Sequence, residues 1–212
     1  MTADGLARVW VRASVLLRAL DADLAGRGAP PEHPVWDRLR QMGALPGDAV
    51  EHFLWLDPQT ALDTHHLLID EAESMHDAVR QVRGTSWRGA GADAYVARWT
   101  HLVDFAEGAN ARMTNTALFL AEAAAWLQDS RDQLAMELAA GLGSREAVSI
   151  RMGLPISGTA SADLAERILA VVAGCQDAGW RLRERWVERV AEVPWREPAG
   201  GHVVVTGHLE VR

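Results

Sequence analysis

Apolar residues recur at helical spacing along most of this chain. In the first 25 residues they fall three or four positions apart, which places one stripe on one side of a helix: Leu6, Val9, Trp10, Ala13, Leu16, Leu17, Leu20 and Leu24. A stripe of this period is typical of an amphipathic helix that buries one side. The pattern predicts an N-terminal helix within residues 1–25, capped by Thr2 and packed on the rest of a bundle.

Residues 26–56 form a connector that is rich in proline and glycine. Two short helices are expected inside it. Pro34 suits the start of one, which Gly43 would end, and Asp48 would cap the other. Large apolar side chains predict that the connector packs against the bundle instead of forming a free linker: Trp36, Phe53 and Trp55.

Residues 57–142 carry two long helical patterns, one over about 57–83 and one over about 90–142. Between them lie Gly84, Gly89 and Gly91, and Ser86 is a candidate N-cap. Because glycine tolerates a positive φ and close backbone approach, we expect the two helices to fold back on each other there. Trp87 would fill the space between the diverging helix ends.

The second of these helices has the clearest pattern of the chain. Its residues step by alternating three and four, which predicts a heptad seam facing a partner helix: Ala92, Tyr95, Trp99, Leu102, Ala106, Ala109, Met113, Thr116, Leu120, Ala123, Leu127, Ser130 and Leu134. Phe105, Phe119 and Trp126 form a second apolar stripe. One partner cannot cover both stripes, so a further helix is expected against the second.

That further helix is predicted within residues 143–195. Gly141, Gly143 and Pro155 mark the break before it, and Ser161 would be its N-cap. Residues 196–212 change character, because β-branched residues there alternate with polar ones, which favours a short extended or β-like tail. The fold class expected is all-α, an elongated helical bundle built on a long antiparallel helical hairpin and followed by that tail.

Composition narrows the kinds of function. A net charge of -8 argues against non-specific nucleic-acid binding, which needs clustered positive charge. No apolar run reaches the ~18 residues of a membrane span, and no signal-peptide pattern is present. We therefore expect neither a nucleic-acid partner nor stable membrane insertion. Cys175, the single cysteine, is expected to be a buried apolar residue.

The junction of the two long helices carries a resemblance. Trp87-Arg88-Gly89, followed by Ala94-Tyr95 and then Trp99, resembles the Trp-X-Gly turn and second-helix start of the WXG family. Members are helical hairpins exported by type VII (ESX) secretion systems. The resemblance covers about residues 62–138. It implies that Trp87 and Gly89 shape the turn, and that Tyr95 and Trp99 fix the start of the long helix.

The function that this resemblance implies is non-enzymatic. The protein would pair with a small helical WXG-like protein or a secretion component, as a secreted substrate or as a module that presents an effector. Export would need no signal peptide, but the Tyr-x-x-x-Asp/Glu signal of the family is missing, since Trp99 follows the only tyrosine, Tyr95, at that spacing. A partner would have to supply the signal. The alternative is a cytoplasmic adaptor or chaperone of the same system.

A third interpretation comes from another class of protein. If the turn lies at Trp87–Gly89, His76 faces His101 and His66 lies near Asn110. Glu73 and His76 form the Glu-x-x-His unit that di-iron bundles use on two helices. A metal-dependent bundle enzyme could use His66, Glu73, His76 and His101, with Asp70 on the same face. The second Glu-x-x-His is missing, so we expect a polar patch or a few buried, hydrogen-bonded histidines, with no metal, no cofactor and no catalytic residue.

Overall fold

A computed structural model describes residues 4–81, 88–152 and 158–191, and every regular element in these ranges is an α-helix. The prediction of an all-helical fold is confirmed for this part of the chain. The helices are α1 (Gly5–Gly26), α2 (Val35–Met42), α3 (Pro46–Trp55), α4 (Pro58–Gln81), α5 (Ala90–Leu142), α6 (Arg145–Arg151) and α7 (Gly158–Ala191). The predicted tail, residues 196–212, lies outside the described ranges.

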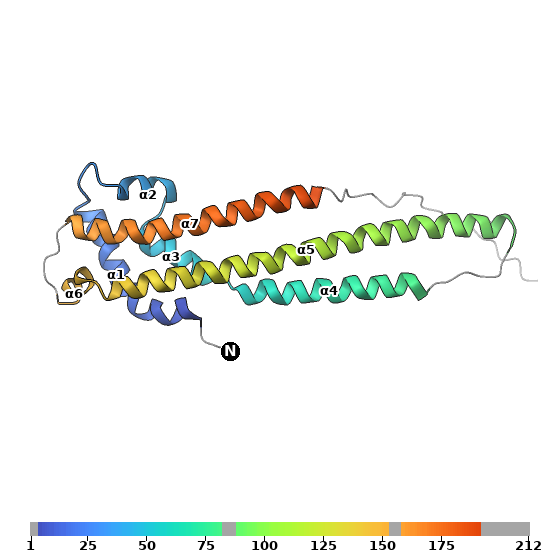
Figure 1. Cartoon of the computed structure of the whole chain (residues 1–212), viewed down its shortest axis with the longest axis horizontal. Coiled ribbons are helices and arrows are strands. Elements are labelled where there is room, and N and C mark those ends of the chain that lie inside the picture. The colour runs from blue at the N-terminus through green and yellow to red at the C-terminus, as the bar shows by residue number, and fades with distance from the viewer. Residues whose placement is uncertain (1–3, 82–87, 153–157, 192–212) are drawn as a thin grey trace, which may run out of the picture.

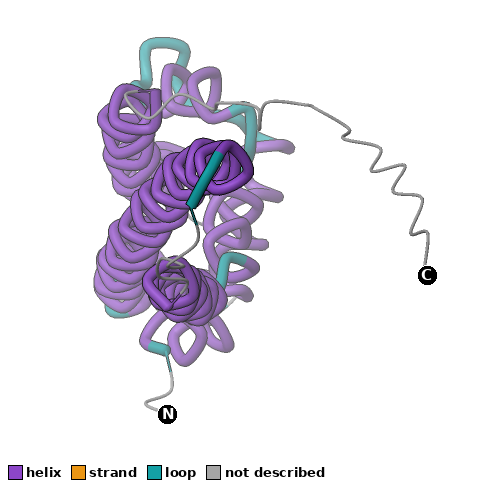
Figure 2. Tube along the Cα trace, turned by 90° about the vertical axis from the view of Figure 1, so that its right-hand side faces the viewer, coloured by secondary structure: helices purple, strands orange, loops and turns teal. Residues whose placement is uncertain are grey.

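The longest helix organises the others. Figure 1 shows α5 running along almost the whole molecule, with α7 beside its C-terminal half and α4 beside its N-terminal half. Helices α1, α3 and α6 contact α5 toward its C-terminal end, and α2 packs on α7 at the same end of the molecule. We call this end of the molecule, together with α7, the body. We call α4 and residues 90–117 of α5 the arm. Figure 2 views the packed helices end-on.

The body and the arm bury different kinds of side chain. In the body, large aliphatic side chains from α1, α5 and α7 are fully buried: Leu6, Leu17, Leu20, Leu134, Leu138, Ile168 and Leu169. In the arm, the buried residues among those described are Ala72, Ala92, Ala106 and Ala117. Alanine lets two helices approach closely but removes little apolar area from water. The hydrophobic stabilisation of the fold is therefore concentrated in the body.

The inner face of α5 agrees with part of the predicted seam and differs from it elsewhere. The predicted residues that are buried are Ala92, Ala106, Leu127, Ser130 and Leu134. Ala117 and Ala124 are buried where the prediction placed Thr116 and Ala123. Continued along the helix, the same three-and-four alternation includes Asn110 and Arg131, two polar residues. The prediction placed Ala109 and Ser130 at these two steps. It is also wrong for Tyr95 and Leu102, which are exposed.

Three predicted helix starts are wrong. Asp4, not Thr2, caps α1, because its Oδ1 accepts the backbone N–H of Leu6 at 3.1 Å. Helix α3 begins before Asp48, at Pro46. Ser161 lies inside α7, fully buried, and its Oγ has no hydrogen-bond partner among the described residues. Many residues are suitable N-caps by their type, and tertiary contacts determine which of them cap a helix.

Elsewhere the boundaries agree with the prediction. Helix α5 has the bounds expected for the long second pattern, residues 90–142. Pro34 precedes α2, and Gly43 ends it with a left-handed φ of 63°. The short helix α6 was not predicted, because seven residues carry too little periodicity to stand out from a loop.

Helix α7 covers part of the second apolar stripe of α5, as predicted. The ring of Phe119 meets that of Trp186 edge to face, with centroids 6.0 Å apart. Trp126 Nε1 donates a hydrogen bond to the Cys175 carbonyl at 2.9 Å. The indole lies so close to α7 that a Cβ on Gly179 would come within 2.7 Å of it. Cys175 is buried in this contact, as expected.

This packing predicts opposite effects for two glycines of α7. A Cβ at Gly174 would meet no atom within 4 Å, so G174A should raise the free energy of unfolding by about 0.5–1 kcal/mol through helix propensity. G179A must displace Trp126 and should lower it by about 1–3 kcal/mol, the usual cost of overpacking. Urea unfolding followed by circular dichroism measures both. Equal effects of the two substitutions would contradict the proposed contact.

Candidate functional site

The arm consists of two antiparallel helices in a defined register. His65 Nδ1 lies 2.8 Å from the carbonyl oxygen of Ala117, and Asn110 Nδ2 donates to the carbonyl of Ala72 at 3.1 Å. The same register places Gln81, the last residue of α4, across from about His101. Residues 90–100 of α5 therefore extend beyond α4, by about 16 Å at 1.5 Å per residue. We call these residues the overhang.

This register corrects the predicted pairing of histidines. Asn110 contacts Ala72 and not His66, so by the same register His76 does not face His101. The prediction assumed that the two helices extend equally far from Trp87–Gly89, whereas α5 extends past α4. The described residues contain no group of three or more His, Cys, Asp or Glu side chains that could hold a metal ion. His66, Glu73, His76 and His101 are not brought together.

The residues of the predicted turn are only partly described. Trp87 and Ser86 lie outside the described ranges, so their predicted roles stay predictions. Gly89 is the N-cap of α5 and has a φ of +109°, a conformation that side-chain-bearing residues rarely adopt. Ser86 is therefore not the N-cap of this helix. Tyr95 and Trp99 lie in the overhang, where Tyr95 is exposed and Trp99 is half-buried.

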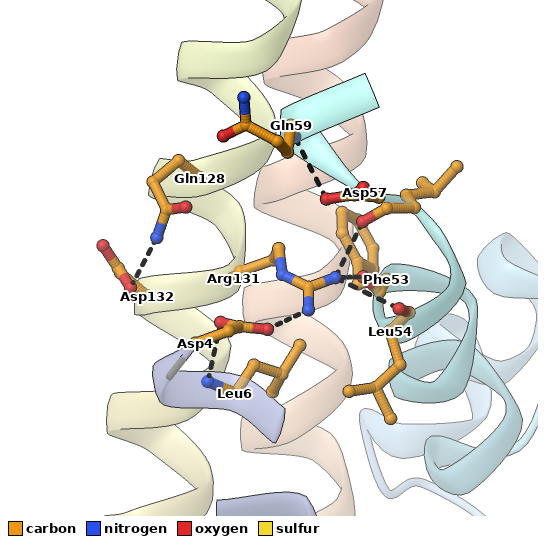
Figure 3. Close-up of polar contacts among 10 residues, drawn as sticks. Asp4, Leu6, Phe53, Leu54, Asp57, Gln59, Gln128, Arg131 and Asp132 are labelled. Atoms are coloured by element: carbon orange, nitrogen blue, oxygen red, sulfur yellow. Dashed lines mark hydrogen bonds and ion pairs between the residues drawn. The ribbon is translucent and has the colours of Figure 1, made fainter. Parts of the chain in front are cut away.

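A buried arginine anchors the base of the arm (Figure 3). The side chain of Arg131, on α5, is 7% exposed. Its Nη1 donates to the carbonyl oxygens of Phe53, Leu54 and Leu56, and its Nη2 pairs with Asp4. The last carbonyls of a helix lack partners within the helix and carry its negative dipole end. Arg131 therefore satisfies the C-terminus of α3 while pairing with the carboxylate that caps α1.

The N-terminus of α3 is also held from another helix. Asp21, on α1, accepts the backbone N–H of Gly47 through Oδ1 at 3.2 Å. Burial raises the pKa of this carboxyl above its ordinary value. Two residues after α3 ends, Asp57 caps α4 by accepting from the Gln59 backbone N–H and the Thr60 hydroxyl, both at 3.0 Å. The position of α3, and with it the start of α4, is fixed at both ends.

The outside of the arm and its base display large apolar side chains. Trp55, at the end of α3, is 79% exposed, and Leu67 on α4 is 66% exposed. Val96 and Leu102 on α5 are exposed as well. These side chains are spread along the arm and its base, and each would lose contact with water where a partner covers it. The apolar pattern of the sequence marked Leu102 and Trp55 as interior, but both are exposed because no helix of the described ranges covers them.

Comparison with known proteins adds no assignment. The chain matches no protein-family model, no curated protein and no solved structure. Among the described helices, none combines the length and the apolar character that crossing a bilayer requires. The features of the chain that point to a function are the arm, its exposed side chains and the Trp-Arg-Gly motif.

The environment of Arg131 predicts a large effect of its removal. R131M leaves Asp4 and the carbonyls at the end of α3 without their donor, so we expect the free energy of unfolding to fall by about 3–5 kcal/mol. R167M is the matched control, because Arg167 forms an exposed pair with Glu137 at 2.6 Å and should cost at most about 1 kcal/mol. Urea titrations measure both values. Similar small losses for the two variants would refute the anchoring role.

Asp4 predicts a dependence of stability on pH. Burial raises the pKa of its carboxyl, but the hydrogen bond and charge of Arg131 outweigh burial, so the pKa lies below the ordinary 3.8. A carboxyl with a lowered folded-state pKa stabilises the fold above the unfolded-state value, and this stabilisation is lost as pH falls through the folded-state value. Wild type should therefore exceed D4N in stability at neutral pH, and the difference should shrink below about pH 4. A difference that is constant with pH would contradict this assignment.

Proposed function

We propose that this chain is a non-enzymatic, WXG-like protein associated with type VII secretion, and that it acts by binding another protein. One observation carries the proposal. The buried side chains of the arm are all alanines, among the described residues, while it displays Leu67, Val96 and Leu102 outside. A two-helix layer of this kind gains most from a partner that covers its exposed apolar side chains.

The sequence at the junction of α4 and α5 supports the family assignment. Trp87-Arg88-Gly89 occupies the connection between two antiparallel helices, and Gly89 has the positive φ that glycine tolerates best. We propose a hairpin turn there, with Trp87 filling it, and Tyr95 and Trp99 at the start of the long helix. The partner would be a small helical protein of the WXG type or a component of the secretion apparatus.

Export is proposed to depend on that partner. Tyr95 is the only tyrosine, and Trp99 stands where the family signal needs an acidic residue. A partner that carries Tyr-x-x-x-Asp/Glu would supply the signal for the pair. The lack of a Tyr-x-x-x-Asp/Glu signal in this chain is also the observation that favours the second candidate, an adaptor or chaperone that stays in the cytoplasm.

The proposal predicts that the exposed apolar side chains of the arm contact a partner in the organism that encodes the chain. A benzophenone amino acid at position 102 should give a cross-linked adduct whose second component is a small helical protein. The matched control is position 148, where Val148 is exposed on α6 in the body and should give no such adduct. Mass spectrometry identifies the adducts, and fractionation locates the protein.

Each outcome of this experiment decides between the candidates. Adducts from position 102 and recovery from the medium only with an active secretion system support the exported protein. The same adducts with recovery only inside the cell support the adaptor. No adduct from position 102, or the same adducts from both positions, would refute the proposal.

A further inference from the structure

The exposed face of α1 is basic and apolar. Arg8, Arg12 and Arg18 lie on it, separated by Val11 and Val15, and Val11 is 74% exposed. No acidic residue occurs between positions 5 and 20 of this helix. The opposite face carries the buried leucines that pack into the body. We call these five residues the α1 stripe.

The exposed face of α4 has the opposite charge. It carries five acidic side chains around Leu67, and the helix has a single basic residue, Arg80. The acidic residues are all exposed: Asp63, Asp70, Glu71, Glu73 and Asp77. We call them, with Leu67, the α4 stripe. Both stripes therefore combine charges of one sign with exposed aliphatic side chains.

The charges of both stripes are unpaired among the described residues. Arg8, Arg12 and Arg18 form no ion pair there, and neither do the acidic residues of the α4 stripe. Some charged side chains elsewhere are paired. On α7, for example, Arg185 and Arg189 approach Glu122 of α5.

The two stripes lie on the same side of the molecule but not together. Figure 1 shows the first half of α1 and the whole of α4 along the lower edge, at different positions on the long axis. Each helix packs on α5, so its exposed side chains point away from α5. The distance from Arg8 to Arg18 along α1 is about 15 Å, which equals that from Asp63 to Glu73 along α4. The two stripes are equal in length and opposite in charge, and each contains exposed aliphatic side chains.

We propose that a second copy of this chain binds here, with the α1 stripe of each copy docked on the α4 stripe of the other. A two-fold axis makes the two contacts identical. Val11, Val15 and Leu67 lie at the centre of each contact, and arginines meet carboxylates around them, which fixes the partner's register. The overhang takes no part in this contact, whereas Leu67 also belongs to the exposed apolar side chains on which the proposed function rests.

Sedimentation velocity of the purified full chain tests the dimer. Because the screening length falls from about 10 Å at 0.1 M salt to about 3 Å at 1 M, the dissociation constant should rise at least about tenfold between these conditions. R12E and D70R should each be monomeric. R181E is the control of equal charge change, because Arg181 is exposed on α7 outside both stripes, and it should remain dimeric.

An equimolar mixture of R12E and D70R gives the decisive result. In the mixed dimer, the new carboxylate of one chain faces the new guanidinium of the other, and the second contact is wild type. Dimers should therefore return in the mixture although neither variant forms them alone. A wild-type chain that is monomeric at all concentrations would overturn the proposal. A dimer that resists both substitutions, or a mixture that stays monomeric, would overturn it too.

Discussion

The arrangement of the helices depends on one buried cation. Arg131 meets the carboxylate of Asp4 and the last carbonyls of α3, and it can do so only when α1, α3 and α5 are all in place. A buried charge that loses its partners costs about 3–5 kcal/mol, a large share of the stability of a domain. Packing these helices in another arrangement therefore costs more free energy than the loss of apolar contacts alone would. Because α4 begins just after α3, this single side chain also fixes where the arm leaves the body.

The unequal distribution of apolar burial has a consequence for dynamics. Leucines and isoleucine fill the body, whereas alanines line the inside of the arm. Segments that bury little apolar surface open at a lower free energy than the core does. The arm is therefore the part of the described chain in which local opening is easiest, and covering it with another protein would stabilise it most. Large aliphatic side chains are tolerated on the outer surface of the arm for the same reason, because the arm has little interior in which to bury them.

The sequence predicted the fold class and the course of the longest helix, because both follow from apolar spacing. It did not predict Asn110 and Arg131 on the inner face of α5, since both are polar and their partners are backbone carbonyls of distant segments. The cap of α3 was missed for a related reason. Its partner, Asp21, lies on another helix, so no local pattern identifies it. The register of α4 on α5 depends on how far α5 extends past its partner, which the position of Trp87 and Gly89 does not determine.

The exposed apolar side chains of the arm were the hardest feature to predict from the sequence, because their exposure depends on which helices end early. Helix α7 ends near the middle of α5 and α4 ends across from about His101, so Leu102 lies near the end of its cover and Val96 beyond it (Figure 1). The overhang and the α4 stripe are consequently separate surfaces. A copy bound along α4 would leave residues 90–100 projecting past the contact, since they extend about 16 Å beyond Gln81. Self-association on α4 and binding of a different protein on the overhang are therefore sterically compatible, and one chain can do both at once.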